Sequence, residues 1–255
     1  MGKGLTVMGS VVVTMVIALG VTWLPDALED AEFFRVTEVT VQGTHYLHEA
    51  RVKELLDLPP GASVWGDLEA WAARVRRHVL VEDAFVHRRL PDRLEVEVRE
   101  RRPVALHPSP VLVPVDRKGR VLPLDLMEHR LDLPIILPPP GAIHGTADLE
   151  GVEEADPARI RSLAREVARL SEADPGFMAL VSEVGMDSAG DMLLHLADPR
   201  AVIHYRGLAS PHELRRSLRL LEHARGFREG EVPAVVDLRF DDRAILRFAE
   251  IEGVL

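Results

Sequence analysis

An unbroken apolar run near the start of the chain is the first feature of its hydrophobic pattern. The 21 residues 4–24 carry no charge, and most of them are hydrophobic. As an α-helix this run would be roughly 31 Å long, which matches the hydrocarbon core of a bilayer. Trp23 lies where an interfacial aromatic side chain is expected, and Pro25 then ends the helix. We therefore expect residues 1–25 to form a short cytoplasmic stub and a transmembrane helix.

Two other interpretations of this run remain open. A cleaved signal peptide shares the positive start, and the small residues Ala18 and Gly20 resemble a cleavage site. However, the apolar core of a signal peptide is typically about 7–15 residues long, which is shorter than this run. A buried helix of a soluble domain is disfavoured by the uniform apolarity. In the favoured orientation, Lys3 stays in the cytoplasm and everything after Pro25 is exported.

A short acidic connector, residues 26–33, leads into a segment that switches between helical and strand periodicity. Apolar residues recur at spacings of three and four in the helical parts and alternate in the strands. The predicted elements are a strand ending at Gly43, helices within 48–58 and 67–79, and a strand hairpin of 81–90 and 93–102. The order is β-α-α-β-β, and we expect residues 34–104 to form one domain.

The second strand of that hairpin predicts how the domain packs. Leu94, Val96 and Val98 alternate with charged residues, so one face of the strand is apolar. We expect this face to pack on both helices, and the charged side chains up to Glu100 to stay in water. Helices on one face of a small sheet make the predicted fold class α+β.

Residues 105–255 predict a second domain, with a mixed sheet and two helices. Prolines make residues 131–145 an irregular or edge segment. Helix starts are indicated at Asp156-Pro157 and at Ser210, where Glu213 completes a capping box. The other expected elements are a hairpin within 111–124 that turns at 116–119, three short strands within 179–207, and a terminal hairpin of 234–240 and 243–248.

Charge and composition exclude several kinds of function. The chain has a net charge of −10, and residues 34–104 carry 12 basic and 12 acidic residues. An acidic protein repels phosphate backbones, so nucleic acid is not an expected partner. The absence of cysteine excludes disulfides, thiolate chemistry and cysteine-based metal sites.

Candidate catalytic or metal-ligating groups are sparse. His45 and His48 lack a third ligand at a metal-binding spacing, and Asp241-Asp242 lacks the alternating oxygen ligands of a calcium loop. We find no phosphate-binding loop, dinucleotide fingerprint, zinc-protease motif or nucleophile elbow. The sequence therefore predicts no cofactor, no metal and no small-molecule substrate, and it favours a protein that is not an enzyme.

Several motifs together resemble the bacterial cell-division protein family FtsQ/DivIB. They are "VTVQGTHYLHEARVKELLDLPPGASVW", "VLVEDAFVHRRLPDRLEVEVRERRPVA", "VPVDRKGRVL", "LPII" and "VVDLRF", in this order behind the apolar run. The resemblance implies a single-pass inner-membrane protein whose first exported domain is a POTRA domain. It also implies a divisome scaffold at the septum, which links the small coiled-coil proteins FtsB and FtsL to septal peptidoglycan synthesis.

The resemblance further implies that the second domain binds an FtsB-type partner by strand addition near its C-terminus. In "RAILRF" the alternation would put Ala244, Leu246 and Phe248 on one face of a strand and Ile245 and Arg247 on the other. The candidate partner-binding residues are Arg239, Phe240, Ala244, Ile245, Leu246, Arg247 and Phe248. The alternative is that these apolar groups belong to the core and that the strand edge is covered.

Two other functions stay open. A POTRA-bearing transport component would receive unfolded polypeptides, but that class usually repeats its POTRA units and adds a long β-barrel. An exported enzyme acting on the cell wall would need a catalytic constellation that the motifs do not supply.

Overall fold

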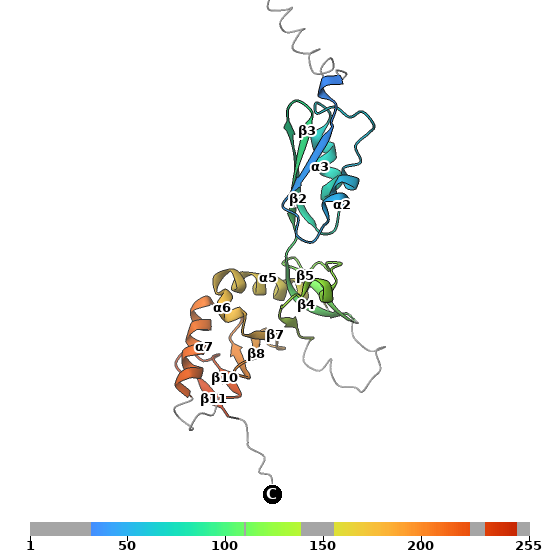
Figure 1. Cartoon of the computed structure of the whole chain (residues 1–255). Helices are drawn as coiled ribbons and strands as arrows, with labels where there is room; N and C mark the ends of the chain where they lie inside the picture. The colour runs from blue at the N-terminus through green and yellow to red at the C-terminus, as the bar shows by residue number, and fades with distance from the viewer. Residues whose placement is uncertain (1–31, 110, 139–155, 225–232, 249–255) are drawn as a thin grey trace, which may run out of the picture. The chain divides into compact units, whose positions relative to one another are not determined.

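The computed structural model describes residues 32–109, 111–138, 156–224 and 233–248, and the chain divides into two compact units between Arg101 and Arg102 (Figure 1). The predicted membrane helix, residues 1–25, lies outside the described residues. Within the described part of the chain, no helix has both the length and the apolarity needed to cross a membrane.

The first unit is a three-stranded sheet with two helices. Its elements are η1 Glu32–Phe34, β1 Glu38–Gln42, α2 Glu49–Leu56, α3 Leu68–Arg76, β2 Val81–Arg89 and β3 Arg93–Glu100. The strand order is β1-β3-β2, in which β3 pairs in parallel with β1 and antiparallel with β2. The predicted β-α-α-β-β order is confirmed.

The apolar face of β3 forms the centre of the first core. Leu94, Val96 and Val98 are buried, together with Trp71 of α3 and Val52 of α2. The opposite face of the sheet carries polar and charged side chains such as His87 and Glu97, both of which are about half exposed. The predicted division into an apolar face under the helices and a charged face in water is therefore confirmed for these residues.

Glu100 departs from that expectation, because its side chain is buried rather than solvated. Only 8% of the residue is exposed. One carboxylate oxygen accepts backbone N–H groups of His45 and Tyr46 at 2.8 and 2.7 Å, and the other accepts that of Leu47 at 2.8 Å. A carboxylate that accepts three amide hydrogen bonds offsets much of the cost of its burial. Glu100 thus fixes the loop that leads from β1 into α2.

The second unit is built on an eight-stranded mixed sheet of order β11-β10-β9-β8-β7-β6-β4-β5. Pro103 and Val104, which the sequence analysis assigned to the first domain, begin β4 of this sheet. The elements are β4 Pro103–Ser109, β5 Val111–Asp116, α4 Leu126–His129, β6 Ile135–Ile136, α5 Pro157–Ala173, α6 Pro175–Met178, β7 Val181–Met186, β8 Met192–Leu196, β9 Ala201–Tyr205, α7 Pro211–Ala224, β10 Val235–Asp237 and β11 Ile245–Arg247.

Both long helices begin where the sequence predicts. Asp156 caps α5 by accepting the N–H of Ala158 at 2.9 Å. At α7 the N–H of Ser210 donates to the Glu213 carboxylate at 2.8 Å, and the Glu213 N–H donates to the Ser210 hydroxyl at 3.3 Å. This reciprocal pair is a capping box and satisfies amide groups that have no partner within the helix.

The prediction for the proline-rich segment was wrong at Ile135 and Ile136, while its other described residues, 131–134 and 137–138, are irregular as expected. We expected residues 131–145 to be irregular or at an edge, but β6 lies inside the sheet between β4 and β7. The strand contains only Ile135 and Ile136, with Pro134 and Pro138 outside it. Because neither proline has to donate within the strand, this short apolar pair can pair on both sides.

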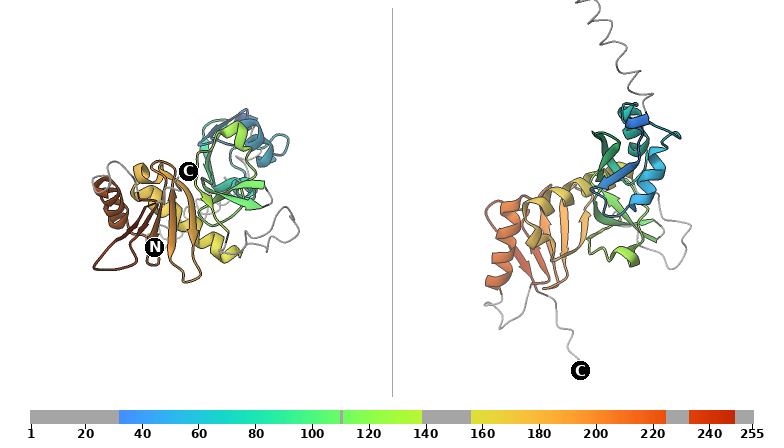
Figure 2. Two further views of the ribbon diagram at one scale, coloured as in Figure 1. Left: turned by 90° about the horizontal axis from the view of Figure 1, so that it is seen from below. Right: turned by 45° about the horizontal axis from the view of Figure 1, so that its top comes forward.

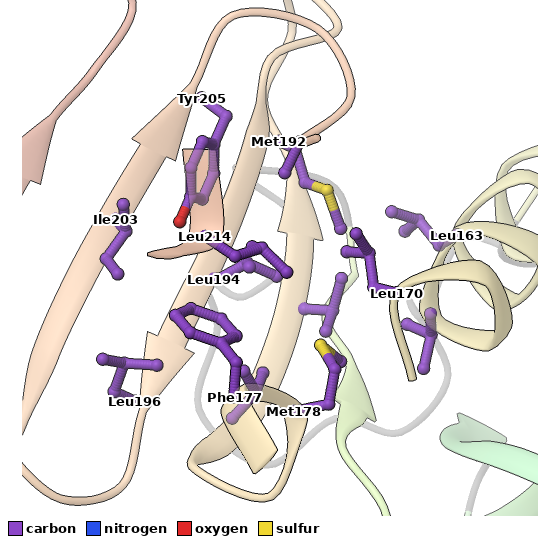
Figure 3. Packing of buried hydrophobic residues seen from close by; sticks show 14 of the residues in the cluster. Leu163, Leu170, Phe177, Met178, Met192, Leu194, Leu196, Ile203, Tyr205 and Leu214 are labelled. Atoms are coloured by element: carbon purple, nitrogen blue, oxygen red, sulfur yellow. The ribbon is translucent and has the colours of Figure 1, made fainter. Parts of the chain in front are cut away.

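One apolar core joins the sheet to its helices. Alternate residues of β8 and β9 lie on the same face, and α5, α6 and α7 cover that face with further apolar side chains (Figures 2 and 3). The largest buried members include Leu163, Leu170, Phe177, Met192, Leu194, Ile203, Tyr205 and Leu214. The Tyr205 hydroxyl lies 2.9 Å from the Ser217 hydroxyl of α7, which in turn donates to the Leu214 carbonyl.

The turn after β5 packs closely against α5. Gly119 has a φ of +70°, and a Cβ at this position would lie 3.0 Å from the Cα of Arg161. After the turn, the chain forms an isolated bridge between Val121 and Val115, and the Leu122 N–H donates to the Pro114 carbonyl. The predicted turn at 116–119 is confirmed, but the principal partner of β5 is β4, which the sequence analysis did not identify.

We predict that Glu100→Gln lowers the free energy of unfolding of the first unit by about 2–3 kcal/mol, because an amide can no longer accept all three N–H groups. The matched control is Glu97→Gln on the solvated face, for which we expect a change within about 0.5 kcal/mol. Urea denaturation followed by tryptophan fluorescence measures both, since Trp65 and Trp71 lie in this unit. Equal midpoints for the two variants would show that Glu100 is not a structural anchor.

A second prediction uses two glycines with left-handed backbone. Gly190→Ala should destabilise the second unit by about 1–2 kcal/mol through φ strain alone, because nothing lies within 4 Å of its added Cβ. Gly119→Ala should cost about 1–3 kcal/mol more, because its Cβ also meets the backbone of α5. The difference between the two melting curves, followed by circular dichroism, isolates the contact with α5. Indistinguishable curves would mean that the backbone of α5 accommodates the added Cβ at position 119 without loss of stability.

Candidate functional site

The predicted partner-binding residues lie at the end of the second sheet. β11 pairs antiparallel with β10, and β10 pairs in parallel with β9. No described strand lies beyond β11, so among the described residues it is the edge of the sheet at this end (Figure 1). An edge strand presents N–H and C=O groups that a further strand can pair with.

The hydrogen bonds of β10 establish which groups of β11 face outward. The Ala234 carbonyl accepts the Val202 N–H, and the Leu238 N–H donates to the His204 carbonyl, so both face β9. The main-chain N–H and C=O groups of successive residues in a strand point to opposite neighbouring strands. Those of Val235 and Asp237 therefore point toward β11.

Their register partners on β11 are Arg247 and Ile245. The main-chain groups of these two residues therefore bond to β10. The N–H and C=O groups of Leu246, between them, point to the open edge.

The side chains of β11 divide between the two faces of the sheet. Ala244 and Leu246 pack against the core. The alternation places Ile245, which is half-buried, and Arg247, which is exposed, on the opposite face. Phe248 follows the strand and is half-buried. The edge thus combines an outward backbone at Leu246 with an apolar side and a basic side.

Phe240 is the exposed aromatic group of this region. Its exposed fraction is 37%, and the guanidinium of Arg243 lies 5.7 Å from the centre of its ring. A cation over an aromatic face is attracted by the ring quadrupole, so Arg243 orients the ring without covering it completely. Phe240 thus presents part of its ring to solvent in the segment that joins β10 to β11.

Arg239 differs from the other predicted site residues because it is held by carboxylates of its own unit. Its Nε and Nη2 atoms donate to the two carboxylate oxygens of Asp237 at 2.9 and 2.8 Å. Its Nη1 atom lies 3.7 Å from Asp187 and 3.6 Å from Asp191. A guanidinium in such a bidentate pair fixes the direction in which the chain leaves β10.

Asp187 and Asp191 extend this arrangement to the turn between β7 and β8. Asp187 accepts the N–H groups of Ala189 and Asp191, and Asp191 accepts that of Gly207 after β9. Three strand ends are thereby tied to one arginine. Sequence reasoning missed both aspartates, and their only signal was the turn-forming sequence "DSAGD".

The hydrogen bond between Arg239 and Asp237 shifts the pKa values of both groups. The hydrogen bond from Arg239 is the main reason that the pKa of Asp237 lies below its ordinary value. The same bond raises the pKa of Arg239. Burial lowers the pKa of His204, which faces Asp237 across the strand pair. At neutral pH this end of the sheet therefore carries a charged Asp–Arg pair beside a neutral histidine.

Metal binding finds no support among the described residues, where no three potential ligands come together. The His45 ring packs edge-on against Tyr46 with 4.6 Å between centres, and His48 precedes α2 at its N-cap. Asp241 pairs with Arg206 at 3.1 Å, and Asp242 pairs with Arg243 at 3.2 Å. Both aspartates thus belong to ion pairs of the turn.

Comparison with known proteins identifies the type of the first unit and relates about two thirds of the chain to one group of proteins. A family model described as "POTRA domain, FtsQ-type" matches residues 34–101. The cell division protein FtsQ of Anaeromyxobacter sp. (strain K) is 34% identical over 161 residues, which cover 62% of this chain and 52% of that protein. FtsQ of Syntrophotalea carbinolica is 27% identical over 166 residues, covering 65% of this chain and 57% of the relative. The matched part thus spans little more than half of either relative's length.

For the buried pair we predict that Asp237→Asn lowers the free energy of unfolding of the second unit by about 2 kcal/mol at neutral pH. Because the pKa of Asp237 is depressed in the folded state, its contribution is present above the ordinary carboxyl pKa and is lost as the pH falls through the folded value. The gap between the variant and the parent should therefore narrow below about pH 4.

Asp241→Asn is the matched control, since its carboxylate is 91% exposed and its pair with Arg206 should contribute less than about 1 kcal/mol. Chemical denaturation at several pH values measures both variants. A gap for Asp237→Asn that does not change with pH would contradict the assigned pair.

Proposed function

Because the chain is related to the FtsQ/DivIB family of cell division proteins and carries their type of POTRA domain, we propose that it is a non-enzymatic scaffold of the division machinery. In this proposal the second unit binds an FtsB-type coiled-coil membrane protein by strand addition at β11. The complex links FtsB- and FtsL-type partners, with other divisome proteins, to septal peptidoglycan synthesis.

The observation that carries this proposal is the outward backbone of Leu246 at the edge of the sheet. A strand laid beside β11 can accept from its N–H group and donate to its C=O group, which continues the sheet by one strand. The edge is built from only three residues, Ile245–Arg247. Neighbouring side chains must therefore supply much of the affinity, and we expect Phe240, the exposed aromatic residue of the segment that leads into β11, to contribute.

Membrane attachment is part of the same proposal. Residues 4–24 are uncharged and long enough to span a bilayer, and Lys3 favours a cytoplasmic N-terminus. Both units would then lie outside the cytoplasm, and the protein would be enriched in the inner membrane at the septum.

The two alternative functions have less support. A transport component that receives polypeptides would be expected to carry repeated POTRA units, and one family match is found, at residues 34–101. A cell-wall enzyme would need converging catalytic groups. The three carboxylates nearest Arg239 are instead paired with its guanidinium. Incubation of the purified protein with peptidoglycan, followed by analysis of released fragments, tests the enzymatic alternative.

The test of the binding edge compares two prolines. Leu246→Pro removes the outward N–H and should weaken partner binding by about tenfold or more, since one main-chain hydrogen bond contributes about 1–2 kcal/mol. Ile245→Pro removes an N–H that bonds to β10 and should chiefly destabilise the terminal hairpin. Leu246→Ala is the matched control, because it shortens the side chain but keeps the amide.

Calorimetric titration with the exported part of an FtsB-type partner measures affinity, and circular dichroism measures folding. Truncation after Asp242 removes β11 and should abolish binding while the first unit stays folded. Full affinity in that truncated chain would place the binding surface elsewhere.

A further inference from the structure

We propose that one end of the first unit is a membrane-contacting surface, which rests in the interfacial layer of the same bilayer that holds the anchor. This tip is formed by η1, the loop of residues 63–66 and the turn of residues 90–92 between β2 and β3. The inference rests on the proposed membrane anchor but not on partner binding at β11.

Three segments that are far apart in the sequence meet at this tip. The Val64 N–H donates to the Phe34 carbonyl, which joins the loop to η1. The Thr37 N–H and hydroxyl donate to the backbone carbonyl and the carboxylate of Asp92, which joins the turn to the start of β1. Figure 1 shows η1 at one end of the unit, beyond the strands.

The tip carries the two most exposed large apolar side chains described in the first unit. Phe33 is 70% exposed and Leu90 is 60% exposed, the two highest values among the large apolar side chains described in the first unit. Both lie on segments of the tip, whereas Val79, at the opposite end of β2, is 44% exposed. Large apolar side chains that reach into water from adjoining segments are characteristic of an interaction surface.

A rigid base presents these side chains. The ring of Phe34 packs edge-on against Phe33 at 5.2 Å and against Trp65 at 5.8 Å between centres. The Arg88 guanidinium lies 5.4 Å from the centre of the Trp65 ring and donates to the backbone carbonyls of Val64 and Gly66. An aromatic base with exposed apolar side chains above it has the composition of a membrane-interface layer.

Charge at the tip favours apolar contact over attraction to anionic lipid. Residues 32–38 and 88–95 contain four arginines and four acidic residues, so their net charge is zero. Arg35 pairs with Glu32 at 3.4 Å, and Arg93 pairs with Glu38 at 3.5 Å. With its charges paired internally, the tip can approach a neutral bilayer as readily as an anionic one.

The short connector between the proposed anchor and η1 makes the bilayer the expected partner of the tip. Eight residues lead from Pro25 to Phe33, and a fully extended chain of that length reaches at most about 29 Å. The tip is therefore confined near the bilayer surface whatever conformation the connector adopts. β2, with nine residues, is itself about 30 Å long, so its Val79 end can lie well away from the lipid while Leu90 touches it.

The absence of native cysteine allows a direct experiment on the full chain. Phe33→Cys, Leu90→Cys and Val79→Cys are each labelled with the same nitroxide and reconstituted in phosphatidylcholine nanodiscs. Electron paramagnetic resonance then measures collisions of each label with oxygen, which concentrates in lipid, and with a nickel chelate, which stays in water. The label at position 79 is the matched control, because it lies at the other end of the same strand.

The expected result is a severalfold higher ratio of oxygen to nickel accessibility at positions 33 and 90 than at position 79. The same ratio is expected when phosphatidylglycerol is added, because the tip carries no net charge. Labels at 33 and 90 that are as open to nickel as the label at 79 would overturn the inference. Protection of the labels at 33 and 90 from the nickel chelate that appears only with phosphatidylglycerol would also overturn the inference, since the contact would then be electrostatic.

Failure of the wild-type chain to associate with the nanodiscs would refute the anchor together with the tip. Retained partner binding in that event would leave the function of β11 intact, so the two failures are distinguishable.

Discussion

Pairing of backbone groups is the constraint on which the second unit depends. In a sheet, each interior strand donates and accepts on both sides, and only the outer strands keep groups for another molecule. The hydrogen bonds from β10 to β9 determine which residues of β10 bond to β11. As a result, the main-chain groups of Ile245 and Arg247 bond inward to β10, and those of Leu246 point to the open edge. The placement of the proposed binding groups thus follows from hydrogen bonds that β10 makes to β9, one strand further into the sheet.

Buried or half-buried carboxylates perform a second common task in both units, because they accept amide groups that turns leave without a strand or helix partner. Glu100 accepts three N–H groups before α2, and Asp116 accepts those of Lys118 and Arg120 in the turn after β5. Asp187 does the same in the turn after β7. The chain therefore uses several of its acidic residues as internal structure, so its net charge overstates how acidic its free surface is.

Local patterns predicted most of the elements, and non-local pairing accounts for what they missed. The alternation in β3, the capping box at Ser210 and the turn at 116–119 are encoded by neighbouring residues, and all three were correct. β4 was missed because Pro103 and Pro108 obscure a strand signal.

The central position of β6 depends on partners about 30 and 50 residues away along the chain, Leu106 and Glu183. No local pattern carries that information. The candidate site shows the same division. The alternation in "RAILRF" predicted which side chains share a face. Of the carboxylates around Arg239, however, those of Asp187 and Asp191 come from a distant turn and could not be read from spacing.

The two ends of the second sheet differ in how they can grow. At the β5 end, Pro114 has no amide to donate, and its carbonyl already accepts from Leu122, while Val121 forms a bridge to Val115. Half of this edge is therefore closed by its own chain. A sheet with two equally open ends could join copy after copy into a fibre. Because half of the β5 edge is closed in this way, the two ends of the sheet are not equally open, which disfavours further growth once a strand has added at β11 as proposed.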